Sequence, residues 1–369
     1  MGQPIIQIAT KARPAWAFCV RKDHPTMTTT TPRRPVKGVE TITLARLLAH
    51  QFPTREALIF PWLRQGESAM LWAAPGTGKT LLTLTLAVLV AGGGTVLGWS
   101  ADKPRKVLLV DGEMSAEDLQ ERVRWLIGTV AGIDPVAAGA NLSIMSRNWQ
   151  PAEVAFPDLG ERETTRQGRK AGQDVVFEAA QRCGAELVLC DNFSTLVELA
   201  DENDAASMTA TLAFLLRLKQ ARIGCVLVHH SGKDGGTYRG SSKLATTFEV
   251  ILGLKPIDTG VALGGAAFRL DWTKYRREPC EAVQPREVRL GTDAEGNAEW
   301  QSAATMDDDT RALLAELKTG KHMLQKSMAE ALGWDQPKVT RTKIAAIAAG
   351  RITTGEWTMW LQAGTEEDF

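Results

Sequence analysis

The stretch LWAAPGTGKTLLTLTLAVLVAGGG, from Leu71 to Gly94, decides the fold of this chain. An apolar strand-like run enters it, a glycine-rich turn follows, and an apolar helical run leaves it. This context makes a phosphate-binding loop credible. The turn, AAPGTGKT, fits the phosphate-loop pattern except that Ala73 stands where the first glycine is usual. Because position 73 ends the strand before the tight part of the turn, we expect the loop to remain functional.

The residues of this turn predict a site for ATP and Mg²⁺. Glycines in the turn let backbone N–H groups face phosphate oxygens, and the helix that begins near Lys79 directs its positive end at the same phosphates. Lys79 can reach the β- and γ-phosphates, and Thr80 can bind Mg²⁺. The residues expected to bind the nucleotide are Pro75, Gly76, Thr77, Gly78, Lys79, Thr80 and Leu81.

Composition excludes several other classes of protein. Lys plus Arg and Asp plus Glu both number 43 in 369 residues, which argues against a protein that simply coats DNA but not against a local DNA site. The five cysteines are odd in number and form no C-x-x-C pair, so reduced thiols in a cytoplasmic protein are expected rather than disulfides or zinc. The longest apolar run is broken by Thr83 and Thr85, and no membrane span is expected.

Strands and helices alternate along the middle of the chain, which predicts an α/β domain with a largely parallel sheet flanked by helices. The expected strands are 69–74, 106–113, 142–145, 185–192, 224–231, 248–256 and 267–278, and the expected helices are 115–130, 173–184 and 206–222. A hairpin is expected around Asp293–Gly296, and the polar segment 147–170 reads as a surface excursion. In the last strand, the alternation predicts Trp272, Lys274 and Arg276 on one face.

Three domains follow from shifts in composition. Residues 1–36 are rich in Pro, Thr and basic residues and are expected to form a disordered lead, within which Met27 is an alternative start. Residues 37–304 form the ATPase domain. Residues 305–369 are expected to form a winged-helix-like unit of three short helices and a hairpin, with Lys338, Arg341, Lys343 and Arg351 on and near its third helix.

Carboxylates at two strand ends are candidates for the chemistry. Asp191 ends the strand ELVLC, where a carboxylate lies beside the loop and holds Mg²⁺. Glu113 ends the strand KVLLVDG and can orient the attacking water, with Asp111, two residues deeper, as its rival. Asn192 follows the metal aspartate where many motor ATPases carry an acidic base, so that base is absent here.

A pair of histidines and several cations supply the remaining candidates. Adjacent side chains on a strand point to opposite faces, so His229 and His230 are not a metal pair. We expect His230 to face the γ-phosphate, with His229 packed behind it. The following loop, SGKDGGTYRGSSK, carries Arg239, a candidate arginine finger acting on a neighbouring subunit. Lys274 and Arg276 are a second candidate pair for that role.

The ordered set APGTGKT, VDGEM, LVLCDNFSTL, VLVHHSGK, YRGSS and WTKYR resembles the RepA-type branch of RecA/DnaB-like hexameric helicases, an AAA-like ATPase family of plasmids and mobile elements. The resemblance covers about residues 40–300. It implies a RecA-like P-loop core, Lys79 and Thr80 as the Walker A pair, Glu113 as the catalytic glutamate and Asp191 as the Walker B aspartate. It also implies His230 as the γ-phosphate sensor, Arg239 as an intersubunit arginine, and Lys274 and Arg276 as a K-x-R element.

The resemblance implies a hexameric ring with ATP sites between subunits and single-stranded DNA in its channel. The leading prediction is therefore an ATP-dependent DNA helicase in replication of a plasmid or mobile element. One alternative is a DNA-stimulated ATPase switch that loads or recruits other proteins. Another is an ATP-ordered regulator whose C-terminal unit binds DNA. That unit is expected to contact duplex DNA or a replication protein.

Overall fold

The computed structural model describes residues 41–151, 156–160, 171–197, 205–231, 246–257, 265–305, 307–348 and 351–362. The chain divides into two compact units, Met1–Pro53 and Thr54–Phe369. The described part of the first unit contains the helix α1 (Leu44–Ala49), whose first turn is capped by the Thr43 hydroxyl. The expected lead, residues 1–36, and Arg239 lie outside the described residues.

The second unit is built on a nine-stranded sheet with the order β13-β12-β11-β10-β3-β9-β8-β6-β7. The six strands from β10 to β7 are parallel, and β11, β12 and β13 are antiparallel. The prediction of a largely parallel sheet is confirmed. Its strands are β3 (Ser68–Ala73), β6 (Val107–Asp111), β7 (Leu142–Ser146), β8 (Leu187–Asp191), β9 (Gly224–His230), β10 (Val250–Pro256), β11 (Ala266–Tyr275), β12 (Arg286–Thr292) and β13 (Ala298–Ala304). Two small antiparallel pairs accompany it, β1 (Ala57–Ile59) with β2 (Leu63–Arg64) and β4 (Gly94–Val96) with β5 (Trp99–Ala101).

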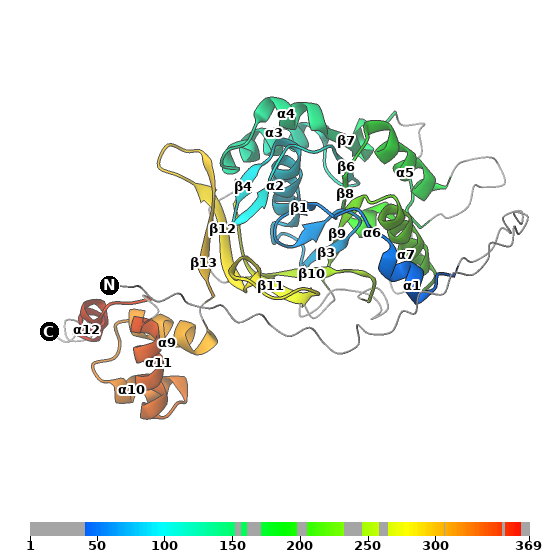
Figure 1. Ribbon diagram of the computed structural model, residues 1–369. Helices are drawn as coiled ribbons and strands as arrows, with labels where there is room; N and C mark the ends of the chain where they lie inside the picture. The colour runs from blue at the N-terminus through cyan, green and yellow to red at the C-terminus, as the bar shows by residue number, and fades with distance from the viewer. Residues whose placement is uncertain are drawn as a thin grey trace, which may run out of the picture. The chain divides into compact units, whose positions relative to one another are not determined.

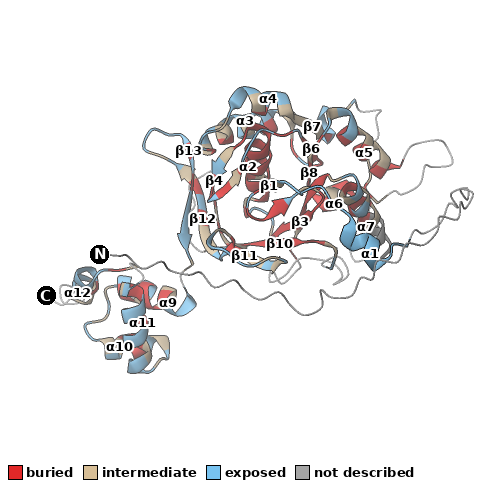
Figure 2. Cartoon of the chain, viewed as in Figure 1, coloured by how far each residue is buried: buried red, intermediate tan, exposed pale blue. Residues whose placement is uncertain are grey.

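Helices cover both faces of this sheet, as Figures 1 and 2 show, and two buried apolar clusters fill the layers between. The first layer holds α2 (Lys79–Gly92), α3 (Ala116–Leu126) and α4 (Pro135–Asn141). The second holds α5 (Gly172–Cys183), α6 (Phe193–Leu196) and α7 (Ala205–Gln220). Because both faces are covered, the parallel strands carry continuous apolar runs. This is the expected RecA-like P-loop core.

The helix α2 is buried around almost its whole circumference. The hydroxyls of Thr83 and Thr85 donate to the carbonyls of Lys79 and Leu81, which satisfies these polar groups inside the core. The indole nitrogen of Trp300, on β13, donates to the Thr85 hydroxyl at 3.0 Å. The apolar run after Lys79 is therefore a core helix. Among the described residues, no helix is long and apolar enough to cross a membrane.

The strand β11 departs from the predicted alternation at a β-bulge. Trp272 pairs with Leu252, but Lys274 pairs with Ile251, so Thr273 is an extra residue. Leu252 and Ile251 belong to the clusters on opposite faces of the sheet. The prediction that Trp272 and Lys274 share a face is wrong, because a bulge reverses the alternation beyond it.

The hairpin expected around Asp293–Gly296 is present as the β12–β13 connection, where the Asp293 carboxylate accepts from the Asn297 backbone. The interpretation of 147–170 as a surface excursion is wrong at Leu159. That side chain is fully buried, and its N–H donates to the Leu196 carbonyl at 2.8 Å.

Residues 307–348 and 351–362 form four helices around their own apolar cluster: α9 (Asp308–Lys318), α10 (Gln325–Leu332), α11 (Gln336–Ala348) and α12 (Thr354–Gln362). The prediction of a hairpin after the third helix is wrong. Residues 354–362 are helical, and the described residues 307–348 and 351–362 contain no strand. Lys338 pairs with Asp309 at 2.9 Å, and the Lys343 ammonium lies over the Trp357 ring.

Candidate nucleotide-binding site

The phosphate loop begins where β3 ends. Ala73 is the last strand residue and pairs with Leu254 of β10 and His230 of β9. Its extended conformation requires no glycine. Gly76 and Gly78 have φ of 75° and 106°, which L side chains rarely adopt. A Cβ on Gly78 would also lie 2.5 Å from the Ala266 Cβ, so this turn requires glycine there and not at position 73.

The Lys79 ammonium is buried inside the turn. It donates to the carbonyls of Ala73 at 3.2 Å and Ala74 at 2.9 Å. Burial lowers the pKa of Lys79, and the charges of Asp191 and Glu113 oppose that shift. A cation that is held by loop carbonyls and two nearby carboxylates is suited to an anionic ligand such as a polyphosphate.

Asp191 ends β8 beside the loop. The side chain is 4% exposed, and burial raises its pKa to about 7 with Asp111 and Glu113 adding to the shift. The Thr80 hydroxyl hydrogen-bonds to this carboxylate, which opposes the shift. Its Oδ1 atom is buried and has no hydrogen-bond partner. A hydroxyl and an unsatisfied buried carboxylate oxygen are ligands that suit Mg²⁺, so these residues fit the metal.

Glu113 and Asp111 have different environments. Asp111 is buried, accepts from the Met114 N–H at 3.2 Å and the Ser146 hydroxyl at 3.2 Å, and has a pKa raised by burial. It therefore shapes the turn after β6. Glu113 is exposed and receives a hydrogen bond from the Asn192 amide at 2.5 Å. Of the two rivals, Glu113 is the one whose carboxylate lines the cavity at the loop.

The two histidines at the end of β9 also differ in their surroundings. His230 is partly exposed and lines the same cavity as Lys79 and Glu113. His229 is 2% exposed and packs edge-to-face against Phe193, with ring centroids 5.2 Å apart. The described residues contain no group of three His, Cys, Asp or Glu side chains that could hold a metal ion.

Of these groups, Lys79, Thr80, Glu113 and His230 line one cavity of about 800 Å³. The loop supplies Pro75, Gly76, Gly78, Lys79, Thr80 and Leu81, the ends of β6 and β9 supply Glu113 and His230, and the remaining walls are Asp118, Glu121, Arg122, Trp125, Gly265 and Thr292. The volume and the convergence of a cation, acids and backbone N–H groups suit a nucleotide.

Lys274 and Arg276 lie elsewhere. Lys274 is in register with Ile251, which pairs with Met70 near the amino end of β3. The P-loop begins three residues further on, about 10 Å along the strand. Both side chains donate to the Thr246 carbonyl, at 3.3 and 2.7 Å. The structure therefore does not bring them to the P-loop of their own chain.

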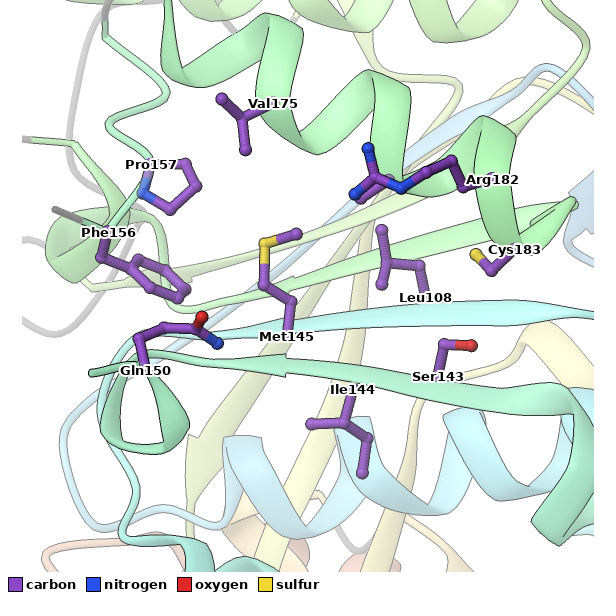
Figure 3. A pocket seen from close by; sticks show the side chains of 11 residues that line it. Leu108, Ser143, Ile144, Met145, Gln150, Phe156, Pro157, Val175, Arg182 and Cys183 are labelled. Atoms are coloured by element: carbon purple, nitrogen blue, oxygen red, sulfur yellow. The ribbon is translucent and has the colours of Figure 1, made fainter. Parts of the chain in front are cut away.

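A second cavity of about 540 Å³ lies between β7 and α5. Figure 3 shows Met145 among the apolar side chains of Leu108, Phe156, Pro157 and Val175, with Arg182 and Cys183 also in its wall. No residue of the phosphate loop and neither Glu113 nor Asp191 lines it. It therefore lacks the groups that a triphosphate requires.

Sequence reasoning missed two contributors to the site. In the sequence, Asn192 stands only as a replacement for an acidic base, yet its side chain contacts Glu113 and caps α6 through Thr195. The Asn148 amide donates to the Met114 carbonyl at 2.6 Å and holds the turn after Glu113. No signal local to either residue predicts a partner so distant in sequence.

A model of the AAA domain family matches residues 32–236, more than half of the chain. The chain belongs to the AAA domain family. The matched part of this AAA domain includes Lys79, Glu113, Asp191 and His230, and it ends before Lys274 and Arg276. An AAA-type P-loop fold with these residues supports ATPase activity.

Among solved structures, a KaiC-like protein from the hyperthermophilic archaeon Pyrococcus horikoshii is similar to this AAA protein with a TM-score of 0.45 at 13% sequence identity. The similarity covers 67% of this chain and 99% of that one. No curated protein matches the sequence.

Proposed function

We propose that this AAA protein is an ATP-driven DNA motor, a helicase that hydrolyses ATP between subunits and moves on single-stranded DNA. The observation that carries the proposal is the single cavity in which Lys79, Glu113 and His230 meet the P-loop. Asp191 hydrogen-bonds to Thr80, which lines the same cavity. A protein that only binds nucleotide has no need of a carboxylate that is exposed to this cavity and held in place by an amide.

The residues of this chain divide the work of hydrolysis. Glu113, held by the Asn192 amide, orients the attacking water toward the γ-phosphate. Lys79 moves from the carbonyls of Ala73 and Ala74 to the phosphates and stabilises their charge. Thr80 and Asp191 would hold Mg²⁺, which neutralises charge on the phosphate oxygens when bound.

The position of Lys274 and Arg276 favours action on a neighbouring subunit. Both cations lie at the amino end of the sheet, whereas the P-loop lies at its carboxyl end. An arginine supplied in trans is an established way to stabilise a phosphoryl transition state. The proposed assembly is therefore a closed ring, a hexamer, in which each ATP site is completed by the next subunit.

The link to DNA is proposed through β9. His230 senses the γ-phosphate at the end of this strand. In the sequence, Lys233, Arg239 and Lys243 follow it in the glycine-rich stretch 232–243. Cations next to a phosphate sensor suit contact with a nucleic-acid backbone. The C-terminal helices are proposed to bind duplex DNA or a replication protein.

The test is ATP hydrolysis with and without single-stranded DNA, combined with strand displacement from a forked duplex and with mass measurement in the presence of an ATP analogue. We expect stimulation by DNA, displacement of the strand, and a ring. Stimulation without displacement would favour a loader or recruiter. Loss of all DNA binding on removing residues 306–369 would favour a regulator that binds through its C-terminal unit.

A further inference from the structure

One face of α3 lines the nucleotide cavity although neither phosphate binding nor hydrolysis requires it. The residues on this face are Asp118, Glu121, Arg122 and Trp125. Their spacing of i, i+3, i+4 and i+7 places them in one stripe along the helix. The adjoining stripe, with Leu119, Val123 and Leu126, packs into the apolar core. The helix is therefore fixed by one face and presents the other to the cavity.

The stripe leads away from the phosphate loop. It starts in the first turn of α3, which follows the turn that carries Glu113. From residue 118 to residue 125 the helix rises about 10 Å. A triphosphate held by Lys79 and Thr80 occupies the loop end of the cavity, so the rest of a nucleotide has this helix face as an available wall.

Trp125 is the most informative member of the stripe. Its indole is half-buried and packs against the apolar core, so its orientation is fixed. A flat, rigid aromatic surface that opens into a nucleotide cavity is suited to stacking on a base.

The polar members of the stripe supply hydrogen-bonding groups. Asp118 and Glu121 are exposed carboxylates that accept hydrogen bonds. The Arg122 guanidinium lies 3.8 Å from the Met114 sulfur, which keeps this cation near the turn after β6. On the remaining wall are Gly265, which has no side chain, and Thr292.

We propose that this face of α3 is the nucleoside subsite of the ATP site, in which Trp125 stacks on the base and Asp118 and Glu121 accept hydrogen bonds from the ribose hydroxyls. The inference rests on the proposed ATPase function and adds to it the groups that read the nucleoside. The subsite would bind the nucleoside, which inorganic triphosphate lacks. Comparing the binding of a nucleotide with that of inorganic triphosphate therefore tests the proposal.

The experiment compares the affinities of MgADP and of inorganic triphosphate for the full-length protein. Trp125→Leu is expected to weaken MgADP binding about tenfold, in line with the loss of one base-stacking contact, and to leave triphosphate binding unchanged. Trp125→Phe is expected to recover most of the loss because it restores a stacking surface. The matched control is Trp149→Leu, since Trp149 is 76% exposed and lines neither cavity.

The outcomes separate this proposal from the proposed function. Equal loss of both ligands in folded Trp125→Leu protein, or no loss of MgADP, would overturn the nucleoside subsite. Lys79→Ala is the independent check on the phosphate site, and it is expected to lose triphosphate as well as MgADP. If Lys79→Ala bound both ligands normally, the ATPase assignment itself would fail.

Discussion

The two ends of the parallel sheet carry cations predicted for the same reaction, but in opposite settings. At the carboxyl end, Lys79 is 7% exposed and enclosed by loop carbonyls and nearby carboxylates. At the amino end, Arg276 is exposed and donates to the Thr246 backbone carbonyl. The first cation is built into the site of its own chain. The second is suited to a site that another chain brings to it.

This contrast is the basis of the proposal that each catalytic site is completed by a second subunit. Glu113 and Lys79 line one cavity, so binding and water activation belong to one subunit. In the proposed ring, charge stabilisation from Arg276 would come from a neighbour, because this residue lies at the other end of the sheet from the P-loop of its own chain. Variants at the two ends should therefore behave differently. A subunit with a substitution at the carboxyl end loses hydrolysis at its own site whatever its neighbour is. A subunit with a substitution at the amino end should regain hydrolysis when its neighbour supplies an intact Arg276.

The largest effect is expected from Lys79→Ala. Loss of the buried ammonium removes the charge that binds the β- and γ-phosphates, and we expect ATP hydrolysis to fall by at least about a thousandfold. The circular dichroism spectrum and melting temperature should remain those of a folded protein. A folded variant that hydrolyses ATP at the wild-type rate would remove Lys79 from the site.

Glu113→Gln is expected to reduce hydrolysis by about a hundred- to a thousandfold while ATP still binds, since only the water-orienting carboxylate is lost. Equilibrium binding and single-turnover hydrolysis measure the two properties separately.

Asp111→Ala is the control for Glu113. It removes an acceptor for the Met114 N–H and the Ser146 hydroxyl, so it should lower the free energy of unfolding by about 1–3 kcal/mol. Hydrolysis by the fraction that remains folded should be retained. If folded Asp111→Ala protein lost hydrolysis and Glu113→Gln kept it, Asp111 would be the residue that orients the water.

Arg276→Ala sharpens the comparison most directly, with an expected loss of about ten- to a hundredfold because other cations share its role. ATP binding should be unchanged. Mixing this variant with Lys79→Ala should restore activity, since an interface with Lys79 from one subunit and Arg276 from the other is complete. No recovery at any ratio would argue against action in trans. The same mixing experiment tests Arg239.

Local patterns in the sequence sufficed for the carboxyl end of the sheet. The spacing of Gly76, Gly78 and Lys79 dictates a backbone turn, and positive φ at both glycines agrees with it. Glu113 and Asp191 could be placed together because the ends of parallel strands meet at one edge of the sheet. Each of these inferences depends on a few neighbouring residues or on a rule of topology.

Features that depend on a single residue or on partners distant in the chain could not be predicted from local sequence patterns. The bulge at Thr273 leaves the apolar alternation of β11 intact up to Trp272 and reverses it only afterwards. The contact of Asn192 with Glu113 joins residues 79 positions apart. By contrast, α12 had a readable signal, since Thr353 and Glu356 cap each other's backbone N–H in a capping box that starts a helix.

The smallest effect concerns the cost of keeping Asp191 buried at the carboxyl end. An Asp with a pKa near 3.8 in the unfolded chain and about 7 in the fold binds more protons when folded between these values. Its ionisation therefore destabilises the metal-free protein as the pH rises from 4 to 7, and the full penalty is present above pH 7. Asn carries no charge there, so Asp191→Asn should melt higher than wild type, by a difference that grows across this window and then levels off.

Thermal melts from pH 4 to 9 in the presence of a chelator measure this difference for Asp191→Asn. Excess MgADP should reverse the order above pH 7, because the wild type binds the metal-bound nucleotide more tightly and so gains more stability from it. A higher melting temperature that is the same at every pH would mean that packing, and not the buried charge, sets the difference. That result would weaken the contrast between the two ends of the sheet: at the carboxyl end stability is lost to hold a charge in place, and at the amino end Arg276 is exposed to solvent.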